Sequence, residues 1–238
     1  MKVRNFTLLL VLMIGIFSGC AVMNTSLQET AEIVKPGHPK IGFEYNYGLD
    51  LTSTVYIQNN PDFDSKKLIA LPLYGIKAGL GLTEDMDINT KLWISFGGIG
   101  AKAYIKHRIP SENEKISMAV APGITYVTTE SDDEEENSSI DIAEIKSYGF
   151  EIPFLATYRV GEALAFTGMA RYSADFIDVK ANESTEKFML NRFGFIGGIS
   201  VELGPLYLRP EGGIEMAAPK NGNFGIAPII AIGAGLDF

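Results

Sequence analysis

The chain has 238 residues, a formal net charge of −9, one Cys and two His. The acidic balance argues against nucleic acid as a partner, because phosphate binding needs clustered Lys and Arg side chains. A single Cys excludes an internal disulfide. No continuous apolar run reaches the 18 residues that a transmembrane helix needs, so no such helix is predicted.

The beginning of the chain, residues 1–19, has the pattern of a signal peptide. A basic start precedes an apolar run over residues 8–17 that is too short to cross a bilayer as a helix. The Ser-Gly pair before Cys20 resembles the lipobox of bacterial lipoproteins, which implies lipid attachment at Cys20. Cleavage after Ala21 by an ordinary signal peptidase is the alternative.

Residues 20–40 are predicted to form a polar tether in the periplasm. The segment carries several polar side chains, and it ends with Pro36, Gly37 and Pro39, which interrupt regular structure. We expect it to connect the lipidated end of the chain to the domain that follows.

From residue 41 onward, apolar residues alternate with polar or small ones, as in strands that have one apolar face. Ten segments show this pattern: 41–57, 67–82, 86–96, 99–109, 115–129, 144–159, 162–177, 187–203, 206–217 and 225–238. Segments 86–96 and 99–109 could instead be one bent strand, and eight or twelve strands are the alternatives to ten. Short connections alternate with longer polar ones such as 58–66 and 178–186, which is the asymmetry of a transmembrane barrel.

Alternation alone does not decide which face of each strand points outward. A soluble barrel of the lipocalin kind turns its apolar face inward around a ligand. Here the second face consists mostly of Gly, Ser, Thr and single charges, which suits a confined lumen better than a solvated exterior. We therefore expect the apolar faces, with Phe150 and Phe193 among them, to point outward into a membrane.

Charged residues on the inner face are expected to pair with one another. A barrel of about eight strands is filled by its own side chains, so ten strands leave little room, and an unpaired charge there is costly. The predicted lumen ion pairs involve Arg159, Arg171, Arg192, Arg209, Glu151, Asp175, Glu202 and Glu211. Such pairs would plug the barrel, and a charged, ion-selective pore is the alternative.

No catalytic residue, metal site or cofactor is predicted. His38 lies in the tether and His107 near a strand end, and neither has an evident partner for acid–base chemistry. The acidic segment 130–144 could gather a divalent cation through its carboxylates, but a solvated surface loop is the favoured interpretation. We therefore expect a protein that is not an enzyme.

The leader, the alternation, the loop asymmetry and the final aromatic residue together resemble the small outer-membrane β-barrel proteins of bacteria. The resemblance is one of pattern and implies an all-β, single antiparallel up-and-down transmembrane barrel over residues 41–238. It also implies a monomer in contact with outer-membrane lipids and inserted by the barrel-assembly machinery, with Phe238 as the assembly signal. Both termini would then lie in the periplasm.

The expected function is a structural, loop-presenting or binding role in the outer membrane. A narrow channel or transporter for small solutes and a lipid-tethered, lipocalin-like carrier are the alternatives.

Overall fold

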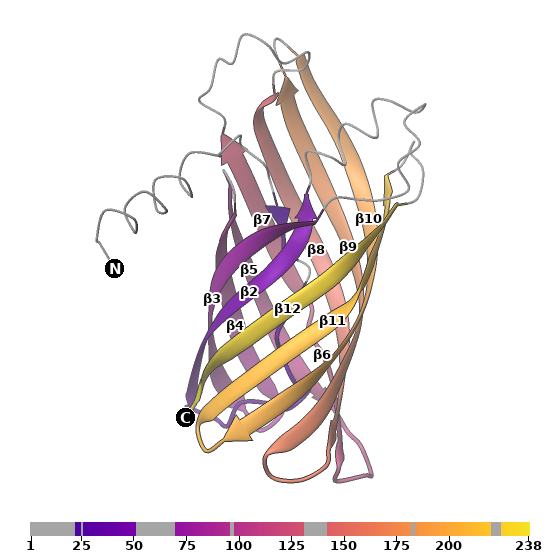
Figure 1. The fold of residues 1–238 in the computed structure, drawn as a ribbon. Coiled ribbons are helices and arrows are strands. Elements are labelled where there is room, and N and C mark those ends of the chain that lie inside the picture. Colours follow the sequence, from indigo (N-terminus) through magenta and orange to yellow (C-terminus); the bar gives the residue numbers. More distant parts are fainter. Residues whose placement is uncertain are drawn as a thin grey trace, which may run out of the picture.

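The computed structural model describes residues 22–24, 26–50, 70–95, 98–130, 142–181, 184–219 and 225–238. These residues form one twelve-stranded sheet that closes on itself (Figure 1). The strands are β1 (Val22–Met23), β2 (Pro39–Asp50), β3 (Ala70–Thr83), β4 (Met86–Ser95), β5 (Gly98–Ile109), β6 (Ile116–Val120), β7 (Gly123–Glu130), β8 (Ile142–Arg159), β9 (Leu164–Ala181), β10 (Ser184–Leu203), β11 (Leu206–Pro219) and β12 (Gly225–Asp237). Within the described ranges, no helix is long and apolar enough to cross a membrane.

Strands β2 to β12 make the closed wall and occupy ten places in it, because β6 and β7 share one place between β5 and β8. This confirms the predicted antiparallel barrel of about ten strands. Each strand pairs with its neighbours in the sequence, and β12 closes the ring by pairing with β2. Strands β4 and β5 form an antiparallel pair from Met86–His107 to Ser95–Gly98, so the single bent strand is wrong.

The predicted strand 115–129 occupies one place in the wall as two pieces, β6 and β7. Pro122 interrupts it, because proline has no N–H to donate to a neighbouring strand. The Pro122 carbonyl instead accepts a hydrogen bond of 3.1 Å from the Ile105 N–H, and the Ala121 N–H donates to the Pro153 carbonyl at 2.9 Å. These bonds hold the bulge between β5 and β8.

The apolar faces point outward, as predicted. Phe43 is 65% exposed, Phe150 44% and Phe193 43%, whereas Arg192 and Glu215 on the opposite face are buried in the lumen. Similar exposed side chains continue around the wall, for example Ile76, Ile94, Phe154, Phe166, Phe195, Leu208 and Ile230. The lipocalin arrangement, with an apolar interior and a polar exterior, is therefore wrong for this chain.

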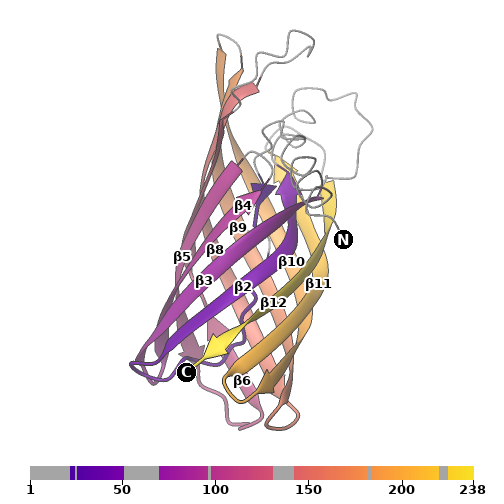
Figure 2. The same ribbon diagram turned by 60° about the vertical axis from the view of Figure 1, so that its left-hand side comes forward.

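Strands β8, β9 and β10 extend farther than the others at the end of the barrel opposite Phe238 (Figure 2). The predicted loop over 178–186 is mostly a hairpin, because β9 continues to Ala181 and β10 begins at Ser184. Ion pairs help to order this extension: Lys187 bonds Asp178 across the hairpin at 2.9 Å, and Lys180 bonds Glu144 on β8.

The structure places the predicted tether differently. Residues 26–31 and Val34 are buried inside the barrel, and β1 pairs with the far end of β2 through Val22–Asp50 and Met23–Leu49. The chain then runs down the lumen and turns at Gly37, whose φ is 75°, before it enters β2. We call residues 26–35 the plug segment.

The two ends of the described chain consequently lie at opposite ends of the barrel. Val22 lies beside the end of β2, whereas the Phe238 N–H donates to the Pro39 carbonyl at the beginning of β2, at 3.2 Å. Residues 1–21 lie outside the described chain, so the expectation that both termini lie in the periplasm stays a prediction.

Candidate functional site in the barrel lumen

Inward-facing glycines provide the space that the N-terminal residues occupy. A Cβ atom on Gly81 would collide with the carbonyl oxygens of Val34 and Lys35, and one on Gly48 would collide with that of Met23. The small residues on the inner face of these strands therefore leave room for another stretch of backbone. Nothing larger than glycine fits there without moving the plug segment.

The centre of the site is the Glu29 carboxylate, which meets three buried lysines from three strands. Its Oε2 lies 2.9 Å from Lys40 Nζ on β2 and 3.2 Å from Lys106 Nζ on β5, and its Oε1 lies 3.2 Å from Lys77 Nζ on β3. All four side chains are at most 3% exposed. The pairs are therefore shielded from water and are much stronger than surface ion pairs.

The plug segment bends sharply just before this carboxylate. Gln28 has a φ of 55°, in a region that residues other than glycine seldom adopt. Its carbonyl oxygen accepts hydrogen bonds from Lys77 and, at 3.3 Å, from Arg209 Nη1. The bend thus presents two acceptors, a carbonyl and a carboxylate, to the same cations.

Further bonds fix the plug segment on the side toward β1. Lys91 Nζ donates to the Ser26 carbonyl at 2.7 Å and lies 2.5 Å from Glu44 Oε2, which it pairs with. The Ser26 hydroxyl donates to Glu211 Oε2 at 2.6 Å. Asn24, which precedes this segment, donates its amide to the same Glu44 carboxylate.

At the opposite end of the lumen the plug segment is tied to β8 and β4. The Arg159 guanidinium donates from Nε to Glu32 at 2.7 Å and from Nη2 to Glu202 at 2.9 Å. The Ala31 N–H donates to the Thr157 hydroxyl at 2.8 Å, and the Val34 N–H donates to Asp87 at 2.9 Å. The segment is therefore anchored along its whole length.

A second polar network joins the walls without the plug segment. Arg192 lies 2.7 Å from both Asp175 and Glu215, and Arg171 lies 2.6 Å from Glu215 and 3.7 Å from Glu151. Lys102 completes it by bonding Glu151 at 2.9 Å. This network links β5, β8, β9, β10 and β11 on one side of the lumen.

Apolar layers seal the lumen between these polar levels. One cluster surrounds Val22 and Met23 and includes Leu73, Trp93 and Ile177. The Trp93 Nε1–H donates to the Val22 carbonyl at 3.0 Å, so the indole holds β1 in place. A second cluster surrounds Leu27 and Ala31 of the plug segment and includes Tyr104, Leu155, Met169 and Ile196.

The structure brings most of the predicted lumen charges together. Four pairs form among them: Arg159–Glu202, Arg171–Glu151, Arg192–Asp175 and, at 3.6 Å, Arg209–Glu202. Glu211 instead accepts the bond from Ser26, and no ion pair of it falls among the described contacts. Sequence reasoning missed Glu29 and Glu32, because both fall in the segment that it placed outside the barrel.

The other predicted sites lie outside the lumen network or outside the described residues. Cys20 and residues 131–141 of the acidic segment lie outside the described residues. His107 is exposed, and His38 hydrogen-bonds the carbonyl oxygen of Phe238. Phe238 itself is 54% exposed at the end of β12.

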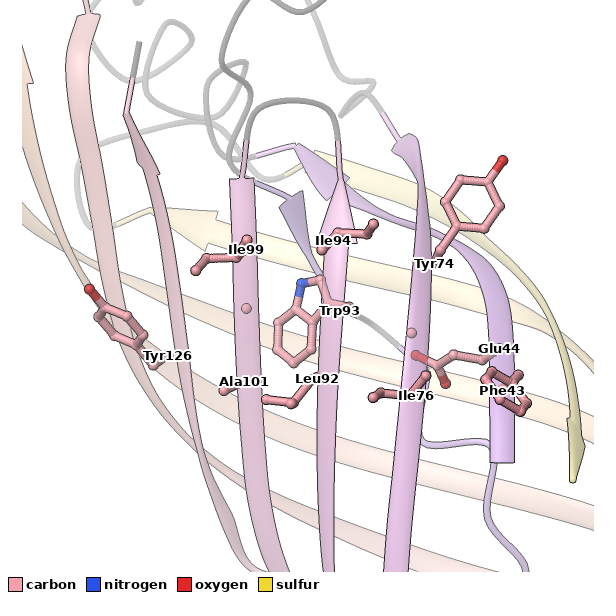
Figure 3. Close-up of a pocket in the computed structure, with 12 residues that line it drawn as sticks. Phe43, Glu44, Tyr74, Ile76, Leu92, Trp93, Ile94, Ile99, Ala101 and Tyr126 are labelled. Carbon is pink, nitrogen blue, oxygen red and sulfur yellow. The ribbon is translucent and has the colours of Figure 1, made fainter. Parts of the chain in front are cut away.

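The outer wall has an apolar hollow of about 610 Å³ over β2 to β5 and β7. Exposed side chains such as Phe43, Ile76 and Leu92 form its rim (Figure 3). Its floor is thin, because Trp93 packs over Gly100 and the Glu44 side chain over Gly75 on the lumen side. Polar groups are nearly absent from it, so it suits a hydrocarbon chain rather than a polar ligand.

The fold and the lumen define a closed antiparallel β-barrel with an apolar exterior and an internal plug. No protein-family model matches the chain, and no sequence among the curated proteins matches it. Its fold is similar to that of the outer-membrane protease OmpT from Escherichia coli, at 11% identity over 84% of this chain and 94% of that one, with a TM-score of 0.43.

Two further barrels show a comparable likeness. The translocator domain of the autotransporter NalP from Neisseria meningitidis is 11% identical over 85% of this chain and 88% of its own, with a TM-score of 0.41. The KdgM porin is 7% identical over 84% of this chain and 99% of its own, with a TM-score of 0.38. At these values the likeness concerns the barrel architecture and assigns no activity to this chain.

One prediction is withdrawn on this finding. We expected a protein without enzymatic activity, but a protease is among the proteins with a similar barrel. A barrel of this kind is therefore no argument against catalysis, since function resides in sites placed on a fold.

Proposed function

We propose that this protein is a barrel of the bacterial outer membrane whose lumen is closed by its own N-terminal residues. The observation that supports it best is the combination of an apolar exterior with a lumen crossed by the plug segment. Exposed Phe, Ile, Leu and Tyr side chains around the whole wall would be unfavourable in water and stable in hydrocarbon. The charges inside the barrel are paired with one another, as Arg192 is with Asp175 and Glu215, which offsets the cost of burying them.

In this proposal the extended strands β8, β9 and β10 present their connecting loops to the outside. The end with Phe238 has short turns, such as those between β8 and β9 and between β10 and β11, and would face the periplasm. The role is then a structural, loop-presenting or binding one in the cell envelope.

The proposed partners follow from the same surface. Outer-membrane lipids would cover the exterior and place an acyl chain in the hollow over β2 to β5 and β7. The barrel-assembly machinery would insert the chain with Phe238 as its signal, and the product would be a monomer. Lipid attachment at Cys20 stays a prediction, which incorporation of labelled palmitate into the protein, but not into its Cys20→Ser variant, would support.

Two measurements test the proposal. The protein is expected to leave bacterial envelopes only with detergent and to migrate faster on a gel before boiling than after it. Reconstituted in planar bilayers, the full mature chain is expected to show no steady conductance. Release by alkaline carbonate without detergent would contradict the membrane location, and a stable open conductance would contradict the closed lumen.

A gated narrow channel is the second candidate, and one observation favours it. The wall-to-wall network of Arg171, Arg192 and Glu215 occupies one side of the lumen, whereas a single stretch of chain fills the remainder. Displacement of that stretch would leave a bore without breaking the ring of ten strands. Conductance that appears only in variants that dislodge the plug segment would favour this candidate.

A further inference from the structure

The cations around Glu29 belong to the wall and not to the plug segment. Lys40, Lys77 and Lys106 contribute the three ammonium groups, and Arg209 on β11 lies beside them, where it donates to the Gln28 carbonyl. We call these four residues the cationic ring. They come from four strands, so the barrel itself holds their side chains at one level of the lumen.

The wall supplies few carboxylates that pair directly with this ring, although Asp237, the register partner of Lys40, lies on the neighbouring strand. Asp87 lies 3.2 Å from Lys106, and Glu202 lies 3.6 Å from Arg209. For Lys40 and Lys77, the one carboxylate that bonds to either among the described residues is that of Glu29. The plug segment therefore brings the carboxylate that pairs directly with two buried ammonium groups of the wall.

The hydroxyl group of Tyr207, next to the cationic ring, has no hydrogen-bond partner among the described residues. Tyr207 lies on β11 and is 1% exposed. The centre of the Tyr207 aromatic ring lies 4.1 Å from Arg209 Cζ, 5.2 Å from Lys77 Nζ and 5.5 Å from Lys40 Nζ. The hydroxyl reaches the positions of Gly42 and Gly235, where only glycine leaves it room. It adds an unused hydrogen-bond donor to a cationic site.

We propose that the cationic ring is a binding site for small carboxylate anions, which Glu29 occupies as an internal ligand. The inference rests on the proposed function, since a lumen closed by the plug segment is what keeps the site occupied. Leaving a buried ammonium group without a counter-charge is strongly unfavourable. Removal of Glu29 leaves Lys40 and Lys77 without this partner, and a small carboxylate that enters would restore the ion pairs. The geometry already present there is that of a carboxylate whose two oxygens accept hydrogen bonds from three ammonium groups.

Chemical rescue of a truncated side chain tests this site in the full chain. Glu29→Ala removes a group the size of acetate and leaves the residues of the ring and the rest of the plug segment unchanged. We expect its unfolding temperature in detergent to fall by about 5–10 °C. Sodium acetate is expected to restore at least half of this loss in a saturable manner, whereas sodium chloride at the same ionic strength restores less.

Matched variants identify where acetate acts. Glu32→Ala removes the other plug carboxylate, which bonds Arg159 outside the ring, and it should gain nothing from acetate beyond what chloride gives. Adding Lys77→Met to Glu29→Ala should raise the acetate concentration needed for half rescue at least tenfold. Equal effects of acetate and chloride on Glu29→Ala, or equal rescue of Glu32→Ala, would overturn the site.

The experiment also gives a result if Glu29→Ala does not fold without acetate. If Glu29→Ala fails to refold in chloride, the yield of refolded barrel in acetate is the readout, and no gain in yield overturns the proposal. The proposed function is tested separately, by detergent extraction and by bilayer conductance of the unaltered chain. Its failure therefore leaves the acetate result intact, and a missing acetate effect leaves the closed membrane barrel standing.

Discussion

Glu29 Oε2 lies 2.9 Å from Lys40 Nζ, although the two residues stand on opposite arms of the turn at Gly37. One residue belongs to the plug segment inside the lumen, and the other begins the wall. The pair therefore closes the U-turn by which the chain leaves the lumen and enters β2. The same chain therefore builds the wall and fills the lumen inside it.

The conservative change Glu29→Gln tests how strongly this contact holds the barrel. The amide keeps the shape of the side chain but removes the carboxylate that pairs directly with Lys40 and Lys77. Breaking a buried ion pair from one side costs about 3–5 kcal/mol. We expect the temperature at which the folded gel mobility is lost to fall markedly.

Glu32→Gln is the matched control for that change. Glu32 also belongs to the plug segment and bonds an arginine, but both side chains are 29% exposed, so water screens their interaction. The loss there should be near 1 kcal/mol or less. Equal destabilisation by the two substitutions would mean that burial within the ring has no special weight.

Gly81→Val tests the fit between the plug segment and the wall. A side chain at this position collides with the backbone of Val34 and Lys35, which cannot rotate away as a long side chain does. The end of the plug segment near Gly37 should be displaced, and protease should then cleave within residues 26–35 of the folded barrel. Gly212→Val is the control, since Gly212 is exposed and its nearest neighbour atom is 3.8 Å from the added carbon. Cleavage in neither variant, or equally in both, argues against a lumen segment seated on Gly81.

The strands of the wall could be predicted because the alternation of apolar and polar residues that marks a strand lies within its own sequence. In β9, Leu164, Phe166 and Tyr172 alternate with Arg171 and Asp175, and a period of two assigns them to opposite faces without knowledge of any partner strand. The same rule places Arg192 and Glu215 inside. Pro122 shows the limit of such patterns, because the break between β6 and β7 depends on bonds to β5 and β8.

The plug segment was not predictable from its own residues. A polar stretch with proline and glycine has the same composition whether it lies in the periplasm or threads a charged lumen. What fixes its place is contact with distant positions, such as Glu29 with Lys106, 77 residues later in the chain. The inner-face glycines were visible in the sequence, but they indicate space rather than its occupant.

The single Trp of the chain reports on the upper end of the lumen. Trp93 donates to the Val22 carbonyl and packs in the apolar cluster with Val22 and Met23. Met23→Asp places a charge in that cluster, and β1 should leave it because burying an unpaired carboxylate is unfavourable. The Trp emission is expected to shift to longer wavelength and to become accessible to acrylamide. Val160→Asp, at an exposed turn, should change neither property, and an unaltered spectrum of Met23→Asp would refute the contact.

The seam between β2 and β12 is the place where the ring closes, and its ladder is short. Seven residue pairs join these strands, from Lys40–Asp237 to Asn46–Ala231, whereas β9 and β10 share a continuous ladder of 18 from Ser184–Ala181 to Val201–Leu164. Above this seam β2 pairs with β1 instead. Closure of the barrel thus depends on a short contact between the two ends of the sheet.

A disulfide across the seam tests the closure directly. Phe43 and Ala234 are register partners, and paired residues on antiparallel strands have Cα separations of about 4.5–5.5 Å, within the range that a disulfide spans. In a Cys20→Ser background, the two cysteines of the Phe43→Cys, Ala234→Cys variant should readily form a disulfide. The disulfide closes nearly the whole barrel sequence into a loop, so the boiled protein should run faster on a non-reducing gel, and reductant should remove this difference. Phe43→Cys with Ile230→Cys is the matched control, because four residues along the strand separate the thiols by about 13 Å. Crosslinking of the control pair but not of the register pair would show that β12 meets β2 in another register.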